Sequence, residues 1–63
     1  MIMRCFFMFK GREYFADGQS VADFRAGFWV DVSLNVVPMH YLNRRYWIPP
    51  HAIQHIEKVT KHD

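Results

Sequence analysis

Four histidines are the residues in this 63-residue sequence whose type and spacing first suggest chemistry. His51 and His55 lie four positions apart and would share one face of a helix. His62 falls near the same stripe, whereas His40 lies elsewhere. Zinc needs three or four ligands, and the sequence has one cysteine and no Cys-x-x-Cys or Glu-containing zinc motif. We therefore expect no metal and no cofactor, and a metal-dependent enzyme ranks last of three functional hypotheses.

The single cysteine, Cys5, is the other residue with reactive chemistry. It alternates with Met3 and Phe7 in an apolar stretch, which is typical of a small core residue rather than a nucleophile. Nucleophilic catalysis also needs a base within hydrogen-bond reach and a pocket that excludes water, and a chain this short offers little volume for one. We expect a protein that is not an enzyme and has no catalytic residues.

Basic and aromatic residues interleave from Arg44 to Trp47, the most informative surface pattern in the sequence. Arginine, tyrosine and tryptophan are enriched at the hot spots of protein interfaces. We expect a partner-binding surface that also draws on neighbours from the first hairpin and on an outward-facing tryptophan. Its candidate residues are Arg44, Arg45, Tyr46, Trp47, Trp29, Arg12 and Tyr14.

The same mixture of residues can hold single-stranded nucleic acid, because bases stack on rings and phosphates meet arginines. In this alternative His51 and Lys10 add further contacts. The segment from Trp47 to Ile53, followed by Ile56, resembles the closing segment of Sm-like barrels. The match covers His51, Ala52 and Ile53 and lacks the lysine that precedes them in that family. The resemblance implies a ring-forming, RNA-binding barrel with His51 at the turn that contacts RNA.

Strands must position these residues, and the first of them is predicted over Ile2 to Lys10. Met3, Cys5, Phe7 and Phe9 form an apolar face at period two. The opposite face is also mostly apolar, so we expect both faces to be covered. Lys10-Gly11-Arg12 predicts a tight turn into a second strand, Glu13 to Ala16, which ends at Asp17-Gly18.

The middle of the chain predicts a second hairpin. Apolar and polar residues alternate from Phe28 to Val36, with Trp29, Asp31, Ser33 and Asn35 on the polar side. A return strand is predicted over Tyr41 to Ile48, beyond the bend at Pro38. Between the two hairpins, Ser20 to Arg25 fits either one helical turn or a short strand.

The last segment has two interpretations. After Pro49-Pro50, residues His51 to Lys58 fit a short C-terminal helix, with Ala52, Ile53, Ile56 and Val59 buried at helical spacing. Alternatively, Pro50 to Ile53 form a tight turn and Gln54 to Val59 form an edge strand. The favoured fold is mainly β, a small curled sheet or a five-stranded SH3/Sm-like barrel, and we prefer the barrel because closure hides the strand edges.

Composition limits the wider interpretation to one small β-rich domain over residues 1–63. Apolar residues make up 51% of the chain, so a folded core is expected. One cysteine permits no internal disulfide, Arg4 interrupts the apolar start, and no apolar run approaches the 18 or so residues of a membrane span. We expect a cytoplasmic protein with no membrane contact. The net charge of +2 does not distinguish a protein partner from a nucleic acid.

Apolar residues exceed what a small core requires. Phe6, Met8, Trp29 and Val37 lie on the second faces of strands whose first faces already form a core. Exposed apolar patches mark interaction surfaces, so we predict a homo-oligomer or a binder of another protein. The leading hypothesis is a non-enzymatic interaction module of the kind that includes phage-type inhibitors such as anti-CRISPR proteins. A small-barrel nucleic-acid-binding protein is the alternative.

Overall fold

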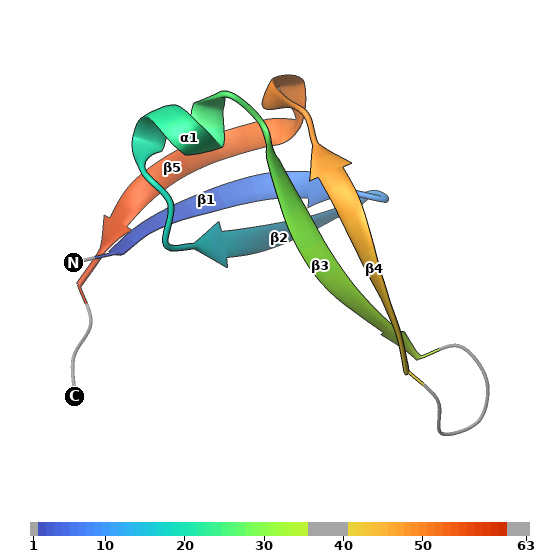
Figure 1. Ribbon diagram of the computed structural model, residues 1–63. Coiled ribbons are helices and arrows are strands. Elements are labelled where there is room, and N and C mark those ends of the chain that lie inside the picture. Colours follow the sequence, from blue (N-terminus) through green and yellow to red (C-terminus); the bar gives the residue numbers. More distant parts are fainter. Residues whose placement is uncertain (1, 36–40, 61–63) are drawn as a thin grey trace.

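The computed structural model describes residues 2–35 and 41–60, and strands make up most of that part of the chain (Figure 1). The elements in chain order are β1 (Ile2–Phe9), β2 (Arg12–Asp17), α1 (Val21–Arg25), β3 (Phe28–Asn35), β4 (Tyr41–Ile48), the 3-10 helix η1 (Pro50–Ala52) and β5 (Ile53–Val59). They form two antiparallel sheets, one in the order β2-β1-β5 and one made of the hairpin β3-β4. The prediction of a mainly β fold is confirmed.

The predicted N-terminal hairpin forms around a two-residue turn. Lys10 and Gly11 both have positive φ angles, 51° and 77°, as a type I′ turn requires. The predicted apolar face of β1 points into the molecule, with Cys5 and Phe7 buried and Met3 and Phe9 packed against them. The other face is only partly covered, since Met8 is exposed, so the expectation of two covered faces is wrong.

The ambiguous segment after β2 is a helix. The Ser20 hydroxyl accepts a hydrogen bond from the Asp23 backbone N–H at 3.1 Å and so caps the N-terminus of α1. Five residues cannot sustain a helix alone, and Phe24 anchors this one by complete burial against Phe28. Within the described residues, no helix has the length and apolar character needed to cross a membrane.

The C-terminal segment is a turn followed by a strand. Pro50–Ala52 form η1, and β5 then pairs with β1, so the edge-strand interpretation is confirmed and the helix from His51 to Lys58 is wrong. The ladder shifts register between Phe6 and Phe7, where one extra residue enters β5. This bulge turns Ile53 and Ile56 toward the same core, although they are three residues apart.

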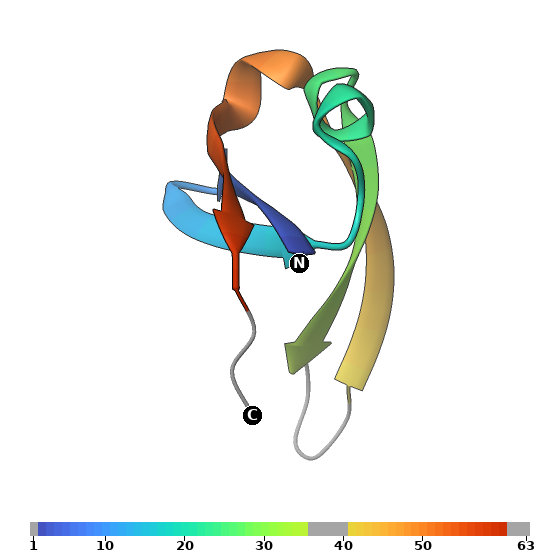
Figure 2. The same ribbon diagram turned by 90° about the vertical axis from the view of Figure 1, so that its left-hand side faces the viewer.

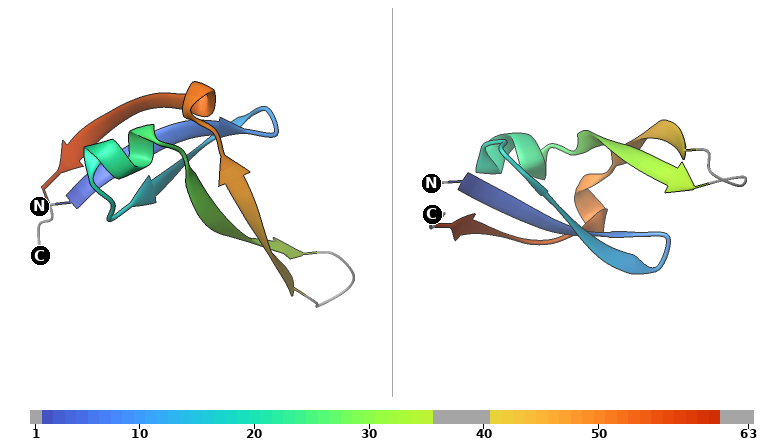
Figure 3. Two further views of the ribbon diagram at one scale, coloured as in Figure 1. Left: turned by 45° about the horizontal axis from the view of Figure 1, so that its top comes forward. Right: turned by 90° about the horizontal axis from the view of Figure 1, so that it is seen from below.

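The closed barrel does not form. Within the described strands, β2 pairs only with β1 and β3 pairs only with β4. The segment containing α1 connects β2 to β3, and the β3-β4 hairpin starts beside the three-stranded sheet and extends away from it (Figure 2, Figure 3). The core lies where β1 meets α1, the start of β3 and the end of β4, and consists of Cys5, Phe7, Phe24, Phe28 and Ile48. The preference for a barrel is therefore wrong, and the alternative of small curled sheets is closer.

Candidate functional site: the tryptophan face

The outer face of the β3-β4 hairpin carries the two tryptophans of the chain. Trp29 and Trp47 are directly opposite in the ladder, and their rings lie 5.4 Å apart between centres. Trp29 is 55% exposed and Trp47 45%, so neither belongs to the core. The next pair on this face is Asp31 and Arg45, whose side chains approach to 3.6 Å in an exposed ion pair. We call these four residues the tryptophan face.

Backbone alternation places these residues together. Phe28 and Ile48 turn inward into the core, so Trp29 and Trp47, the adjacent residues, must turn outward. The Trp47 ring packs directly against the backbone of Gly27. A Cβ at position 27 would overlap the ring, and the φ of 91° there is one that glycine adopts readily. The tryptophan face is thus held by a regular hairpin and a close backbone approach.

A shallow hollow of about 360 Å³ lies beside the tryptophan face. It separates the tryptophans from α1, and its lining includes Gln19, Asp23 and Ala26 on one side and Trp29, Arg45 and Trp47 on the other. The lining combines apolar rings with charged groups of both signs. Such a surface suits a protein side chain entering next to the rings, because rings supply contact area and charges fix orientation.

The predicted residues from Arg44 to Trp47 do not share one face of the hairpin. These residues alternate along β4, so Arg45 and Trp47 face outward whereas Arg44 and Tyr46 lie on the inner face. Tyr46 contacts Phe9 at 4.8 Å between ring centres, and the Lys10 Nζ lies 5.1 Å from the Tyr46 ring centre. The expected neighbourhood of the first hairpin therefore exists, but only for the inward half of the cluster.

The remaining predicted residues also lie away from the tryptophan face. Tyr14 is on the inner face of β2, opposite Phe7, and Arg12 is on the same face at the end of the turn. Lys10 is in the turn itself, and His51 is in η1. The structure brings Arg12, Tyr14 and Lys10 to one side of the molecule and the tryptophan face to the other.

Sequence reasoning missed a second aromatic cluster on the outer face of the three-stranded sheet. Phe15 is 55% exposed, and its ring lies 6.0 Å from Phe6, which in turn stacks on His55 at 4.4 Å. The predicted surplus of Phe6 is thus largely covered by its cross-strand neighbours. The signal for Phe15 was its pairing with Phe6, which follows from the two-residue turn. Val37, also predicted as surplus, lies outside the described residues.

Arg4 orders one edge of this second cluster. Its guanidinium makes two hydrogen bonds to the Asp17 carboxylate, at 2.7 and 2.9 Å, and lies 4.1 Å from the centre of the Phe15 ring. The paired guanidinium holds the pKa of Asp17 below its ordinary value. This is the best-formed ion pair in the described strands, and its geometry is that of a structural contact.

The residues considered for metal and nucleophilic chemistry are separated. His55 is on β5 and stacks on Phe6, whereas His51 is in η1, so the two do not share a helix face. His40 and His62 lie outside the described ranges. Within residues 2–35 and 41–60, no three His, Cys, Asp or Glu side chains cluster as metal ligands. Cys5 is fully buried, and this burial raises the pKa of its thiol.

Comparisons with protein-family models, with curated proteins and with solved structures returned no match for this chain.

Proposed function

We propose that this protein is a cytoplasmic, non-enzymatic interaction module that binds another protein through the tryptophan face. The observation that carries the proposal is the pair of half-exposed tryptophans, Trp29 and Trp47, in contact across a regular hairpin. Single exposed apolar residues are ordinary on protein surfaces, whereas contiguous patches mark interaction sites. Tryptophan is also among the residue types most enriched at hot spots.

The charged pair beside the rings supports a protein partner over a nucleic acid. Arg45, the cation of the tryptophan face, already lies beside Asp31. An acidic side chain at this position repels phosphate, whereas a protein partner can complement both signs. The other candidates for nucleic-acid contact, Lys10 and His51, do not lie on this face. A second copy of the chain also fits the proposal, since a two-fold dimer buries the same patch on both subunits.

The experiment is a pull-down with the tagged protein from a nuclease-treated lysate of the organism that encodes it, at low and high salt. We expect to capture a protein that remains bound at high salt. Trp29→Ala and Trp47→Ala should each weaken capture by about 30-fold, the effect of losing a hot spot worth about 2 kcal/mol. Met8→Ala is the control, because Met8 is an exposed apolar residue on the outer face of the other sheet and lines neither the hollow beside the tryptophans nor the other cavity of the molecule described below.

Two results would reject the proposal. In the first, both tryptophan variants capture the partner as well as the parent does, and each has the circular dichroism spectrum of the parent. In the second, a parallel preparation without nuclease recovers nucleic acid and no protein, and high salt releases the nucleic acid. Counterion release makes nucleic-acid binding weaken steeply with salt.

A further inference from the structure

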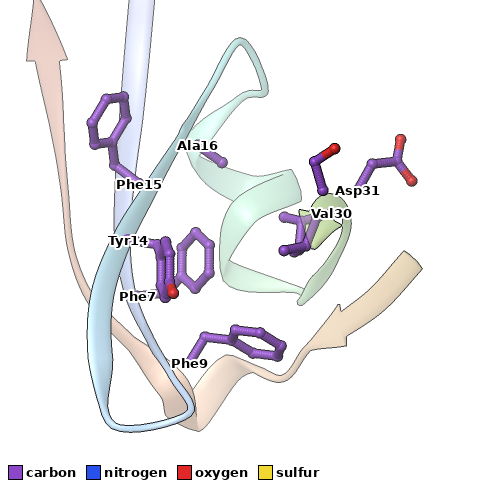
Figure 4. Close-up of a pocket in the computed structure, with 9 residues that line it drawn as sticks. Phe7, Phe9, Tyr14, Phe15, Ala16, Val30 and Asp31 are labelled. Atoms are coloured by element: carbon purple, nitrogen blue, oxygen red, sulfur yellow. The ribbon is translucent and has the colours of Figure 1, made fainter. Parts of the chain in front are cut away.

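A second surface lies on the inner side of the hairpin, where an apolar groove of about 390 Å³ separates β2 from β3 (Figure 4). Phe7 and Phe9 of β1 form its floor. Its two walls are runs of consecutive residues, Tyr14 to Ala16 from β2 and Val30 to Ser33 from β3. A strand face contributes every second residue, so consecutive residues show that each strand turns its edge toward the groove.

Within the described strands, the edge of β2 that faces away from β1 pairs with no other strand. The residues that flank a two-residue turn exchange backbone hydrogen bonds, so the pairing of Phe9 with Arg12 directs the backbone groups of Arg12 toward β1. Directions alternate along a strand, and the hydrogen bond from the Gly18 N–H to the Met3 carbonyl confirms the phase. Glu13 and Phe15 therefore direct their N–H and C=O groups away from β1, and Phe15 lines the groove. Such an edge is a template for one more strand.

The inner faces of the strands have a charge of one sign. By the ladder registers, the charged residues on these faces are Arg12, Arg44 and Lys58. The acidic residues of the described strands are all on outer faces, namely Glu13, Asp17, Asp31 and Glu57. Lys10 adds to the inner side, since its Nζ lies over the rings of Phe9 and Tyr46. The groove is therefore apolar along its floor. Arg12 and Arg44 pair in the ladders with the lining residues Phe9 and Val32, and Asp31 is the one charged side chain in the lining itself.

We propose that this groove binds an extended acidic and apolar segment of a partner protein, which pairs with the free edge of β2 as an additional strand. Apolar side chains of the segment pack between Tyr14 and Val30, and its carboxylates meet Arg12 and Arg44. The backbone pairing supplies affinity, and the alternate side chains supply specificity. The groove and the tryptophan face share Asp31 and no other residue, so each binding mode can fail in experiment while the other stands.

The test uses a panel of capped ten-residue peptides in which Val, Ile or Phe alternate with Asp or Glu. Binding is followed by amide NMR shifts of the isotope-labelled protein. We expect the Glu13 and Phe15 amides to shift and to gain protection from hydrogen exchange. Glu13→Pro, which removes an edge N–H, should weaken binding about tenfold, the effect of roughly one lost hydrogen bond. Glu13→Ala removes the same side chain, keeps the N–H, and should bind like the parent.

Further comparisons keep the inference testable if Glu13→Pro does not fold. The same peptides with alternate N-methylated residues should lose binding, because they cannot pair with the strand edge. Lysine in place of the acidic residues should weaken binding, as should Arg12→Gln and Arg44→Gln in the protein. The proposal would be overturned if no peptide bound at about 1 mM, or if N-methylated peptides bound as well as the unmodified ones. It would also be overturned if the peptides did not bind at the edge of Glu13 and Phe15 and an oligothymidylate or a second copy of the chain did.

Discussion

At the scale of residues, Asp17 is the side chain whose ionisation is most directly coupled to folding. Two hydrogen bonds from Arg4 stabilise its carboxylate, so its pKa in the folded protein lies below that of the unfolded chain. The stabilisation is therefore fully present above the ordinary Asp pKa of about 3.9. It disappears as the pH falls through the lower, folded-state value, because the unfolded chain binds the proton first.

Asp17→Asn should consequently be less stable than the parent at neutral pH, and the difference should shrink as the pH falls below about 4. Urea unfolding followed by tryptophan fluorescence at a series of pH values measures both curves. Parallel curves would show that the Arg4 to Asp17 pair does not contribute to the pH dependence of stability.

Elements of this fold depend on a few local contacts, and α1 is the clearest case. Ser20→Ala removes the side-chain oxygen that accepts from the Asp23 N–H, so we expect a loss of about 1 kcal/mol in the free energy of unfolding. In a chain this small, that loss lowers the melting temperature by roughly 4–8 °C. Gln19→Ala, an exposed neighbour, should change the free energy of unfolding by less than about 0.5 kcal/mol. Equal effects of the two variants in thermal melts would remove the capping contact from the account.

The β3-β4 hairpin depends on Gly27 in a way that a matched glycine can isolate. Gly27 and Gly18 have similar positive φ angles, 91° and 103°, but only position 27 places an added Cβ against Trp47. Both Gly→Ala variants should lose about 1–3 kcal/mol from backbone strain, and Gly27→Ala should lose more. It should also change the near-ultraviolet circular dichroism of the tryptophans, which Gly18→Ala should leave intact. Equal losses with unchanged spectra would contradict the packing of Trp47 on Gly27.

For the whole molecule, period-two patterns were sufficient to predict the elements but not their closure. The alternation of Phe28, Val30 and Val32 with polar residues located β3, and the apolar face of β1 located the core. Closure depends instead on how the short segment around α1 directs β3, and a five-residue helix has too little periodicity to indicate that direction. The sequence pattern is therefore compatible with a barrel, but the direction that β3 takes after α1 prevents the sheet from closing.

Two other limits have equally specific causes. Ile53 and Ile56 are three apart, which fits a helix, but the bulge in β5 gives a strand the same inward spacing. The run from Arg44 to Trp47 is continuous in sequence, whereas a strand distributes neighbours to opposite faces. The structure therefore divides the predicted site residues, with Arg45 and Trp47 on the tryptophan face and Arg44 and Tyr46 on the inner side of the hairpin.

The central claim is that the tryptophan face is open in the free protein and covered by a protein in the bound state. Trp29 and Trp47 are the only tryptophans in the chain, so intrinsic fluorescence reports on this face alone. The most direct measurement is acrylamide quenching of that fluorescence in the dilute protein and in its complex with the captured partner or a second copy. We expect red-shifted, readily quenched emission in the free protein, and blue-shifted, protected emission in the complex. Emission that binding leaves unchanged, or that is already protected in the free protein, would contradict it.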